Sequence, residues 1–367
     1  MHLLEIGAIR NKPAAGLYLA LTRRCPLSCA HCSTDSSSTS EQHPETPFRR
    51  LVESFDHETR PDLLLMSGGE ALLRAALVAD LARTARSVGS RSYVLSGMWF
   101  ARESRRLPAP VSAAIREVDH FAASLDEFHE REVGRADVFR AMHRIRELVP
   151  QVSFQLTGRG DDDPYLQGLV DDVRREFDDQ VPILVGTLSP IGRGRQLGGL
   201  TPTPSSGVPV APVDPCDRIT WPLVTYDGTV YACCNQDLVE RRMPEHLILG
   251  HASHQSWPEL REKFLRRELY RALRVLGPSF VAARFSDGPC DKGMCGNCLT
   301  LSGDAEAERK VTEYLRSDSG RQVEAAARRM VEQVDGTAFS DRRSGRYGGL
   351  VSLGWEEADR EQPSYTS

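Results

Sequence analysis

Six short runs of apolar or β-branched residues alternate with longer amphipathic segments over the first half of the chain. Each run has the length of a buried strand, and the intervening segments place apolar residues at helical spacing. This alternation predicts an α/β fold in which βα units pack helices on a mostly parallel sheet. The predicted strands are residues 17–22, 63–66, 92–96, 120–125, 152–157 and 183–188, and two of the predicted crossover helices are residues 71–87 and 136–148.

The chain changes character after residue 197. Residues 198–215 contain five prolines and three glycines, too many for a helix or a central strand, and they predict a linker. Residues 223–233 are two β-prone runs around Asp227-Gly228, a strong signal for a tight hairpin. We therefore expect a small α+β domain after the linker.

Beyond the hairpin, residues 257–276 and 305–334 predict helices, and residues 290–298 predict an irregular loop. The polar residues at the end of the chain predict a loosely held tail. The predicted units are residues 1–200, a linker at 201–215, an auxiliary domain at 216–303, and a C-terminal helix and tail at 304–367.

Composition and charge narrow the class of protein. The 367 residues are 40% hydrophobic and 26% charged, which is ordinary for a globular protein and unlike a disordered chain. A formal charge of -5 gives no basic field for nucleic acid. No run approaches the ~18 apolar residues of a membrane span, and Glu5 and Arg10 break the apolar run that a signal peptide would need. We expect a cytoplasmic protein with neither a nucleic-acid nor a membrane partner.

The nine cysteines fall into two groups. Clustered thiols in a chain without a secretion signal favour metal binding over disulfides. Cys25, Cys29 and Cys32 follow the first predicted strand, at the strand end where barrel-like α/β proteins build active sites. Three thiolates on one loop can hold three irons of a cubane and leave the fourth iron open. A structural zinc site instead takes four protein ligands, commonly as two pairs.

This first group resembles the cysteine motif of the radical S-adenosylmethionine (radical SAM) superfamily. His31 fills the position before the third cysteine, where that family has an aromatic residue or histidine. Further matches follow other predicted strands: Gly68-Gly69-Glu70 after the second, Ser124 and Asp126 at the fourth, and Gly192-Arg193 after the sixth. After the third strand, Ser96-Gly97-Met98 departs from the Thr-Asn-Gly that is frequent in the family.

The resemblance covers residues 17 to about 195 and implies a partial (β/α)6 TIM-like barrel. It implies that the three cysteines bind a [4Fe-4S] cluster and that His31, Gly68, Gly69, Glu70, Ser124, Asp126, Gly192 and Arg193 lie around S-adenosylmethionine. In that family the Gly-Gly-Glu receives the amino group of the methionine moiety, and glycine lets the backbone approach the ligand closely. The implied chemistry is reductive cleavage of S-adenosylmethionine to a radical that abstracts hydrogen from an unactivated carbon. The electron donor would be a protein such as flavodoxin or ferredoxin.

The second cysteine group has a Cys-x11-Gly-x4-Cys pattern followed by a Cys-x2-Cys pair. Its members are Cys216, Gly228, Cys233, Cys295 and Cys298. The hairpin turn folds Cys233 back toward Cys216, and four thiolates are a complete ligand set for an iron–sulfur cluster. The pattern resembles the SPASM and twitch extensions of radical SAM enzymes and implies one auxiliary [4Fe-4S] cluster, with Cys290 as an alternative ligand. A four-cysteine zinc site is the alternative.

Two residues are candidates for catalysis. His129 follows the fourth predicted strand and is a natural acid or base; the alternative is a solvated charge cluster at the start of a helix. Cys234 could donate a hydrogen atom to a substrate radical, as in related epimerases. The alternative is a small buried residue that points away from its neighbour Cys233.

Two classes of substrate fit the resemblance. One is a small polar natural-product intermediate, such as an aminocyclitol or a sugar, that is dehydrogenated or epimerised. The other is a ribosomally made peptide that is crosslinked or oxidised by a SPASM-type maturase. The cysteine motif begins at residue 25, without the N-terminal leader-binding domain of many peptide maturases, and we therefore expect the small molecule. A zinc-binding module without enzyme activity is the third possibility.

Overall fold

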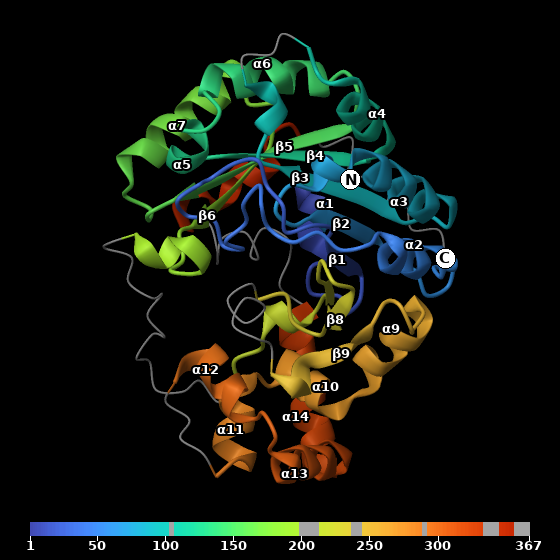
Figure 1. Cartoon of the computed structure of the whole chain (residues 1–367). Helices are drawn as coiled ribbons and strands as arrows, with labels where there is room; N and C mark the ends of the chain where they lie inside the picture. The colour runs from blue at the N-terminus through green and yellow to red at the C-terminus, as the bar shows by residue number, and fades with distance from the viewer. Residues whose placement is uncertain (103–105, 198–212, 236–243, 288–291, 333–344, 356–367) are drawn as a thin grey trace.

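A parallel sheet forms the framework of the molecule (Figure 1). The computed structural model describes residues 1–102, 106–197, 213–235, 244–287, 292–332 and 345–355. The six predicted strands are all present, so the predicted α/β class is confirmed. They are β1 (Gly16–Ala20), β2 (Leu63–Ser67), β3 (Arg91–Ser96), β4 (His120–Leu125), β5 (Gln151–Gly158) and β6 (Ile183–Thr187). Neighbours in sequence pair in parallel, from β1 with β2 to β5 with β6.

Helices connect these strands and cover one face of the sheet (Figure 1). They are α2 (Thr46–Glu53), α3 (Ala75–Ser87), α4 (Ala109–Glu117), α5 (Glu127–Glu130), α6 (Arg135–Ile145) and α7 (Pro164–Glu176), with short 3-10 turns η1 (Ala71–Arg74), η2 (Trp99–Ala101) and η3 (Gly192–Gln196). Side chains alternate along each strand. Leu17 and Leu19 of β1 enter the core shared with the helices, whereas Tyr18 points to the interior on the other face.

The predicted hairpin is confirmed, and it extends the same sheet. Strands β7 (Leu223–Val224) and β8 (Thr229–Tyr231) are antiparallel and joined by a turn in which Gly228 has φ +94°. Strand β7 pairs in parallel with β1, and β9 (Ile248–His251) continues beyond β8. The described part of the chain therefore contains one nine-stranded sheet with the order β6-β5-β4-β3-β2-β1-β7-β8-β9.

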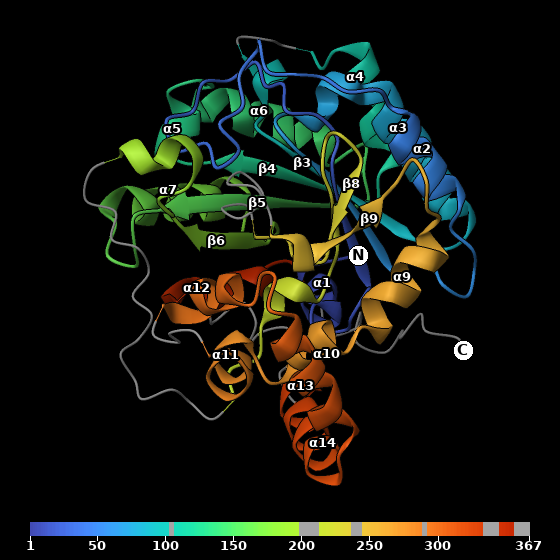
Figure 2. The same ribbon diagram turned by 60° about the horizontal axis from the view of Figure 1, so that its bottom comes forward.

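The C-terminal helices gather on the other side of the molecule from α3, α4, α6 and α7, as both views show (Figures 1 and 2). They are α9 (Trp257–Arg266), α10 (Glu268–Val275), α11 (Pro278–Phe285), α12 (Gly293–Thr300), α13 (Ala305–Arg316) and α14 (Asp318–Glu332), preceded by the turns η4 (Asp217–Ile219) and η5 (Glu245–Leu247). The predicted irregular loop over residues 290–298 is wrong where the structure describes it, because Cys295 and Cys298 lie on α12. The linker at residues 201–215 lies mostly outside the described residues.

Two short elements pack against the face of the sheet that carries Tyr18. They are α1 (Leu3–Ile9) and the 3-10 segment η6 (Gly345–Ser352). Leu3, Tyr93, Trp221 and Val351 belong to one buried cluster there. The tail was expected to be loose, but Tyr347 and Val351 of η6 are buried. No helix in the described ranges is both long and apolar enough to cross a bilayer.

Candidate active site

The first cysteine group lies on the loop after β1. Cys25 and Cys29 are buried and Cys32 is partly exposed. Burial raises the pKa of the Cys25 thiol to about 12, and the neighbouring Cys29 and Cys32 act in the same direction. The three thiols therefore lie near one another in a desolvated site. A bound metal would compensate the cost of forming thiolates there, because coordination deprotonates a thiol.

The number of thiols distinguishes between metals. Three free thiols follow β1 on one loop and line one cavity. A structural zinc site takes four protein ligands, whereas three thiolates can each bind a different iron of a cubane and leave the fourth iron open. The donor set fits an iron–sulfur cluster better than zinc.

The glycine-rich turn after β2 supports this cysteine loop. Gly69 N donates to Thr22 O (2.6 Å), and Glu70 N donates to Arg24 O (2.9 Å). A Cβ on Gly69 would lie 2.4 Å from Arg24 O, and one on Gly68, at φ +132°, would lie 2.4 Å from Thr22 O. Both glycines are therefore required for close contact between the turn and the backbone that leads into the cysteine loop.

Glu70 is buried and bonded to protein donors. Its carboxylate accepts hydrogen bonds from Leu72 N (3.0 Å), Gly97 N (3.0 Å) and Ser96 Oγ (3.0 and 3.1 Å). Burial raises its pKa to about 7 against the effect of these bonds. The carboxylate thus links the ends of β2 and β3, whereas Gly68 and Gly69 line the cavity beside the cysteines.

The turn after β6 holds the other side of the loop. Gly192 has φ +53°, and a Cβ there would lie 2.2 Å from Cys32 O. Arg193 N donates to Cys32 O (2.9 Å), and its Nε donates to Cys29 O (3.1 Å). Gly192 and Arg193 were expected around S-adenosylmethionine; in the structure they contact the backbone of the cysteine loop.

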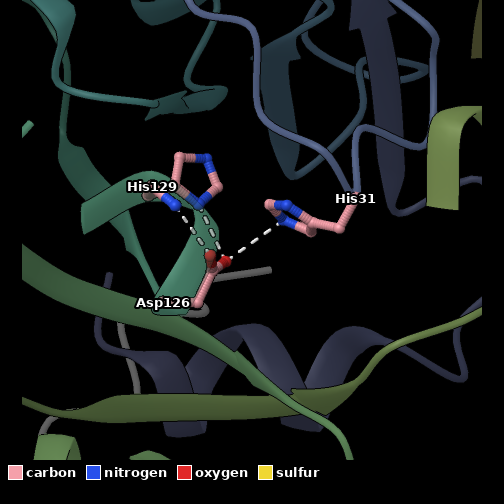
Figure 3. Close-up of side chains that lie close together, drawn as sticks. All are labelled: His31, Asp126 and His129. Carbon is pink, nitrogen blue, oxygen red and sulfur yellow. Dashed lines mark hydrogen bonds and ion pairs between the residues drawn. The ribbon is translucent and has the colours of Figure 1, made fainter. Parts of the chain in front are cut away.

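His31, Asp126 and His129 form a hydrogen-bonded triad (Figure 3). Asp126 Oδ2 accepts from His129 Nδ1 (2.8 Å) and lies 3.1 Å from His31 Nε2, and Oδ1 caps α5 by accepting from Phe128 N and His129 N. Burial alone would lower the pKa of His129, but the Asp126 carboxylate raises it to about 10. The pKa of Asp126 is lowered because the two histidines outweigh its burial. Sequence reasoning named these residues separately and missed the triad.

A cavity of about 290 Å³, here called the cluster cavity, opens beside these groups. It is lined by all three cysteines of the first group and by His31, Gly68, Gly69, Ser124, His129 and Arg193. Sequence reasoning missed Gln155, Thr157 and Thr187, which line it from β5 and β6. Polar residues within predicted strands are the signal that could have identified all three.

The second cysteine group is also brought together. Burial raises the pKa of Cys216 to about 12, with Cys295 among the groups that contribute. Cys298 lies near Cys216 and Cys295, and Cys233 lies near Cys216 and Cys298. These four thiols therefore share one site, in which Cys216, Cys233 and Cys298 are buried and Cys295 is partly exposed. Cys290 lies outside the described residues.

Other polar groups surround the second set. Asn235 Nδ2 donates to Cys295 Sγ (3.2 Å), and His246 Nε2 lies 3.6 Å from Cys298 Sγ. Cys234 is bonded to the N-terminal segment: its Sγ accepts from Arg10 Nη2 (3.6 Å). Sequence reasoning missed Arg10, Asn235 and His246.

Comparisons with known proteins give similar folds only. No protein-family model matches the chain, and no curated protein matches it. Two similar structures are of Streptococcus suis SuiB. The structure bound to S-adenosylmethionine has 10% identity and a TM-score of 0.43, covering 61% of each chain. The structure bound to precursor peptide SuiA has 10% identity and a TM-score of 0.49, covering 75% of this chain and 69% of that one.

A third similar structure is native anSMEcpe with bound AdoMet and the Cp18Cys peptide. It has 12% identity and a TM-score of 0.46, covering 86% of this chain and 99% of that one. This chain thus spans about three fifths of the SuiB structure bound to S-adenosylmethionine. All three TM-scores are below 0.5, and the functional proposal below depends on the residues of this chain.

Proposed function

We propose that this chain is a radical SAM enzyme with one auxiliary iron–sulfur cluster. The observation that carries the proposal is the set of three thiols on the loop after β1, which line one cavity with Gly68, Gly69 and Ser124. Cys25, Cys29 and Cys32 would hold the first [4Fe-4S] cluster. Cys216, Cys233, Cys295 and Cys298 would hold the second, because four thiolates complete its ligand set. S-adenosylmethionine and the first cluster, when bound, would supply a 5'-deoxyadenosyl radical.

The protein's own groups would bind and orient the cofactor. The turn at Gly68 and Gly69 would present backbone to the methionine moiety, because no side chain intervenes. Glu70 would act on that turn by fixing it to β3, since its carboxylate is engaged by Ser96 and Gly97. The triad would hold His129 at the wall of the cluster cavity, where we retain it as the proposed acid or base.

We propose a peptide substrate in place of the expected aminocyclitol or sugar. A second cavity, about 400 Å³ and here called the interior cavity, adjoins the cluster cavity. Most of its lining is apolar or aromatic, and its charged residues in the described lining are Arg10 and Arg218. The apolar walls would give a polyhydroxylated substrate few hydrogen-bond partners, and the two arginines would repel a cationic aminocyclitol. An apolar peptide side chain suits this surface.

Cys234 also lines the interior cavity. We retain it as the proposed hydrogen-atom donor to a substrate radical. The resulting sulfur radical would need one electron and one proton to return to the thiol, and the electron would come from a donor protein such as flavodoxin or ferredoxin. Loss of 5'-deoxyadenosine-dependent product in Cys234→Ala, with 5'-deoxyadenosine still formed, is the behaviour expected of this residue.

The proposal is tested by emptying each cysteine set in turn. Two cubanes predict about eight irons per chain. Replacing Cys25, Cys29 and Cys32 with Ala should remove about four irons and abolish S-adenosylmethionine cleavage. The matched variant, Cys295→Ala with Cys298→Ala, should also remove about four irons but retain some 5'-deoxyadenosine formation. Undiminished 5'-deoxyadenosine in the triple variant would overturn the first assignment, and stoichiometric zinc in the wild type would overturn the second.

A further inference from the structure

The interior cavity is lined by residues of α1 and of strands β1, β2, β3, β6 and β7. Apolar and aromatic groups dominate its walls, among them Leu3, Ile6, Tyr18, Leu65, Tyr93 and Trp221. It shares Ser67, Gly68 and Gln155 with the cluster cavity. The two cavities therefore adjoin one another, and a molecule in the interior cavity would lie next to the proposed cofactor site.

Arg10 forms the charged part of one wall. It is 2% exposed, and its guanidinium lies 4.6 Å from the ring centroid of Trp221 and 6.0 Å from that of Tyr18. It donates to Thr220 Oγ1 and to Cys234 Sγ. The stacked ring and these bonds fix the plane of the guanidinium. Arginine held in this way is preorganised for a planar anion.

Arg218 adds a second positive charge to the same cavity. It lies on the turn η4 and interacts electrostatically with Asp217, Cys234 and Cys295. Asp217 is the carboxylate that acts on both arginines. Arg10 and Arg218 therefore bring two guanidinium groups to one cavity whose lining is otherwise largely apolar.

We propose that the interior cavity binds a carboxylate attached to an apolar or aromatic group, with Arg10 and Arg218 as its charged partners. The inference deepens the proposed function, because it names the chemistry of the substrate. A carboxylate matches the fork of a guanidinium in a bidentate pair. The apolar walls would take the attached group, and Cys234, already bonded to Arg10, would lie beside it. The carboxylate could belong to the C-terminus of a peptide or to a free small acid.

Isothermal titration calorimetry can test this on the chain with both clusters reconstituted. Saturating S-adenosylmethionine should be present, so that its own carboxylate cannot occupy the site. The probes are N-acetyl-L-phenylalanine and its neutral amide. The acid should bind at least tenfold more tightly than the amide. Equal binding of the two, or tighter binding of glucosamine than of the acid, would overturn the proposal.

Variants show whether the two arginines are responsible. Arg10→Gln and Arg218→Gln should each weaken binding of the acid at least tenfold and leave the amide nearly unchanged. Arg274→Gln is the matched control, because Arg274 is also buried (6% exposed) but lies on α10 outside the cavity lining. If Arg10→Gln does not fold, the less buried Arg218→Gln carries the comparison. Wild-type affinity for the acid in Arg218→Gln would refute the assignment.

Two further probes separate the sources of the carboxylate. Gly-Ala-Phe with a free C-terminus should bind as tightly as N-acetyl-L-phenylalanine if a peptide end is the ligand, and its C-terminal amide should not. Binding of the single-residue acid alone would identify a free small acid. Measurement of 5'-deoxyadenosine in the same preparation separates the two proposals. If 5'-deoxyadenosine is formed but the acid does not bind more tightly than the amide, only this inference is overturned. If the acid binds more tightly but no 5'-deoxyadenosine is formed, only the radical SAM assignment is overturned.

Discussion

Gly69 both packs against the backbone that leads into the cysteine loop and lines the cluster cavity. Its missing Cβ would lie 2.4 Å from Arg24 O and 2.7 Å from Arg23 O. Because both contacts are with backbone, Gly69→Ala must displace the segment that leads into the cysteine loop, at a cost of about 1–3 kcal/mol. We expect a lower melting temperature and the loss of about four irons per chain, measured by calorimetry and iron assay.

Gly168 provides the control for that substitution. It lies exposed on α7, and a Cβ there would meet nothing within 4 Å. Gly168→Ala should raise stability by about 0.5–1 kcal/mol, as expected in a helix, and keep all its iron. Full iron content in Gly69→Ala would show that the cysteine loop does not depend on this contact.

Several residue-scale predictions could be made from sequence, but their bonding partners could not. Asp126 was expected beside the cofactor because the resemblance to the radical SAM family implies it. The structure engages both of its carboxylate oxygens, with His31, His129 and two backbone donors. Spacing along the chain reveals that residues follow parallel strands and hence share a sheet edge. Spacing does not reveal which of these residues will form hydrogen bonds or ion pairs with one another at that edge.

At the scale of elements, His120 joins two strands to the start of the chain. Its Nε2 lies 2.7 Å from Ser153 Oγ on β5, and its Nδ1 lies 2.9 Å from Met1 O. Burial lowers its pKa to about 3 from the model-peptide value of 6.5. A depressed histidine pKa contributes stability that is present above pH 6.5 and is lost as the pH falls toward 3.

Replacing this imidazole should therefore make the free energy of unfolding fall less steeply as the pH is lowered below 6.5. For one proton the slope reaches about 1.4 kcal/mol per pH unit. His120→Asn should lose less unfolding free energy than the wild type between pH 6.5 and 4.5, measured by urea denaturation. His57→Asn, at an exposed position, is the control and should follow the wild-type curve. Parallel curves for His120→Asn and wild type would contradict the expected coupling.

The elements that sequence predicted well are those with strong local patterns. All six strands of the first half agree with their predicted ranges to within two residues at either end, and the Asp227-Gly228 hairpin is present. The segment with Cys295 and Cys298 was mistaken for a loop because its glycines and thiols give no helical apolar stripe. It is nevertheless the helix α12, with Asn297 and Cys298 buried. Tertiary contacts, not local propensity, stabilise that helix.

At the scale of the whole molecule, the two halves of the chain share one sheet across the β1–β7 pairing. Tyr18 N donates to Pro222 O (3.0 Å), and Ala14 N donates to Thr220 O (2.9 Å). Trp221 is fully buried at this junction, and its Nε1 donates to Lys12 O (3.2 Å). The sequence predicted two separate units because the proline-rich segment hides this pairing. No local pattern reveals that strands far apart in the chain will be neighbours.

Gly16 makes this junction testable. A Cβ on Gly16 would lie 2.2 Å from the ring of Trp221, so Gly16→Ala must displace the indole and, with it, the stacked guanidinium of Arg10. Overpacking of this kind costs about 1–3 kcal/mol. We expect a lower melting temperature and a red shift of tryptophan fluorescence as Trp221 gains contact with water. Gly186→Ala on β6 is the matched strand control, because its Cβ would meet only Leu156 O, at 3.9 Å. If Gly16→Ala has the same melting temperature and tryptophan emission as Gly186→Ala, the junction tolerates a displaced indole. Trp221 would then not be needed to hold Arg10 in place for a carboxylate in the interior cavity.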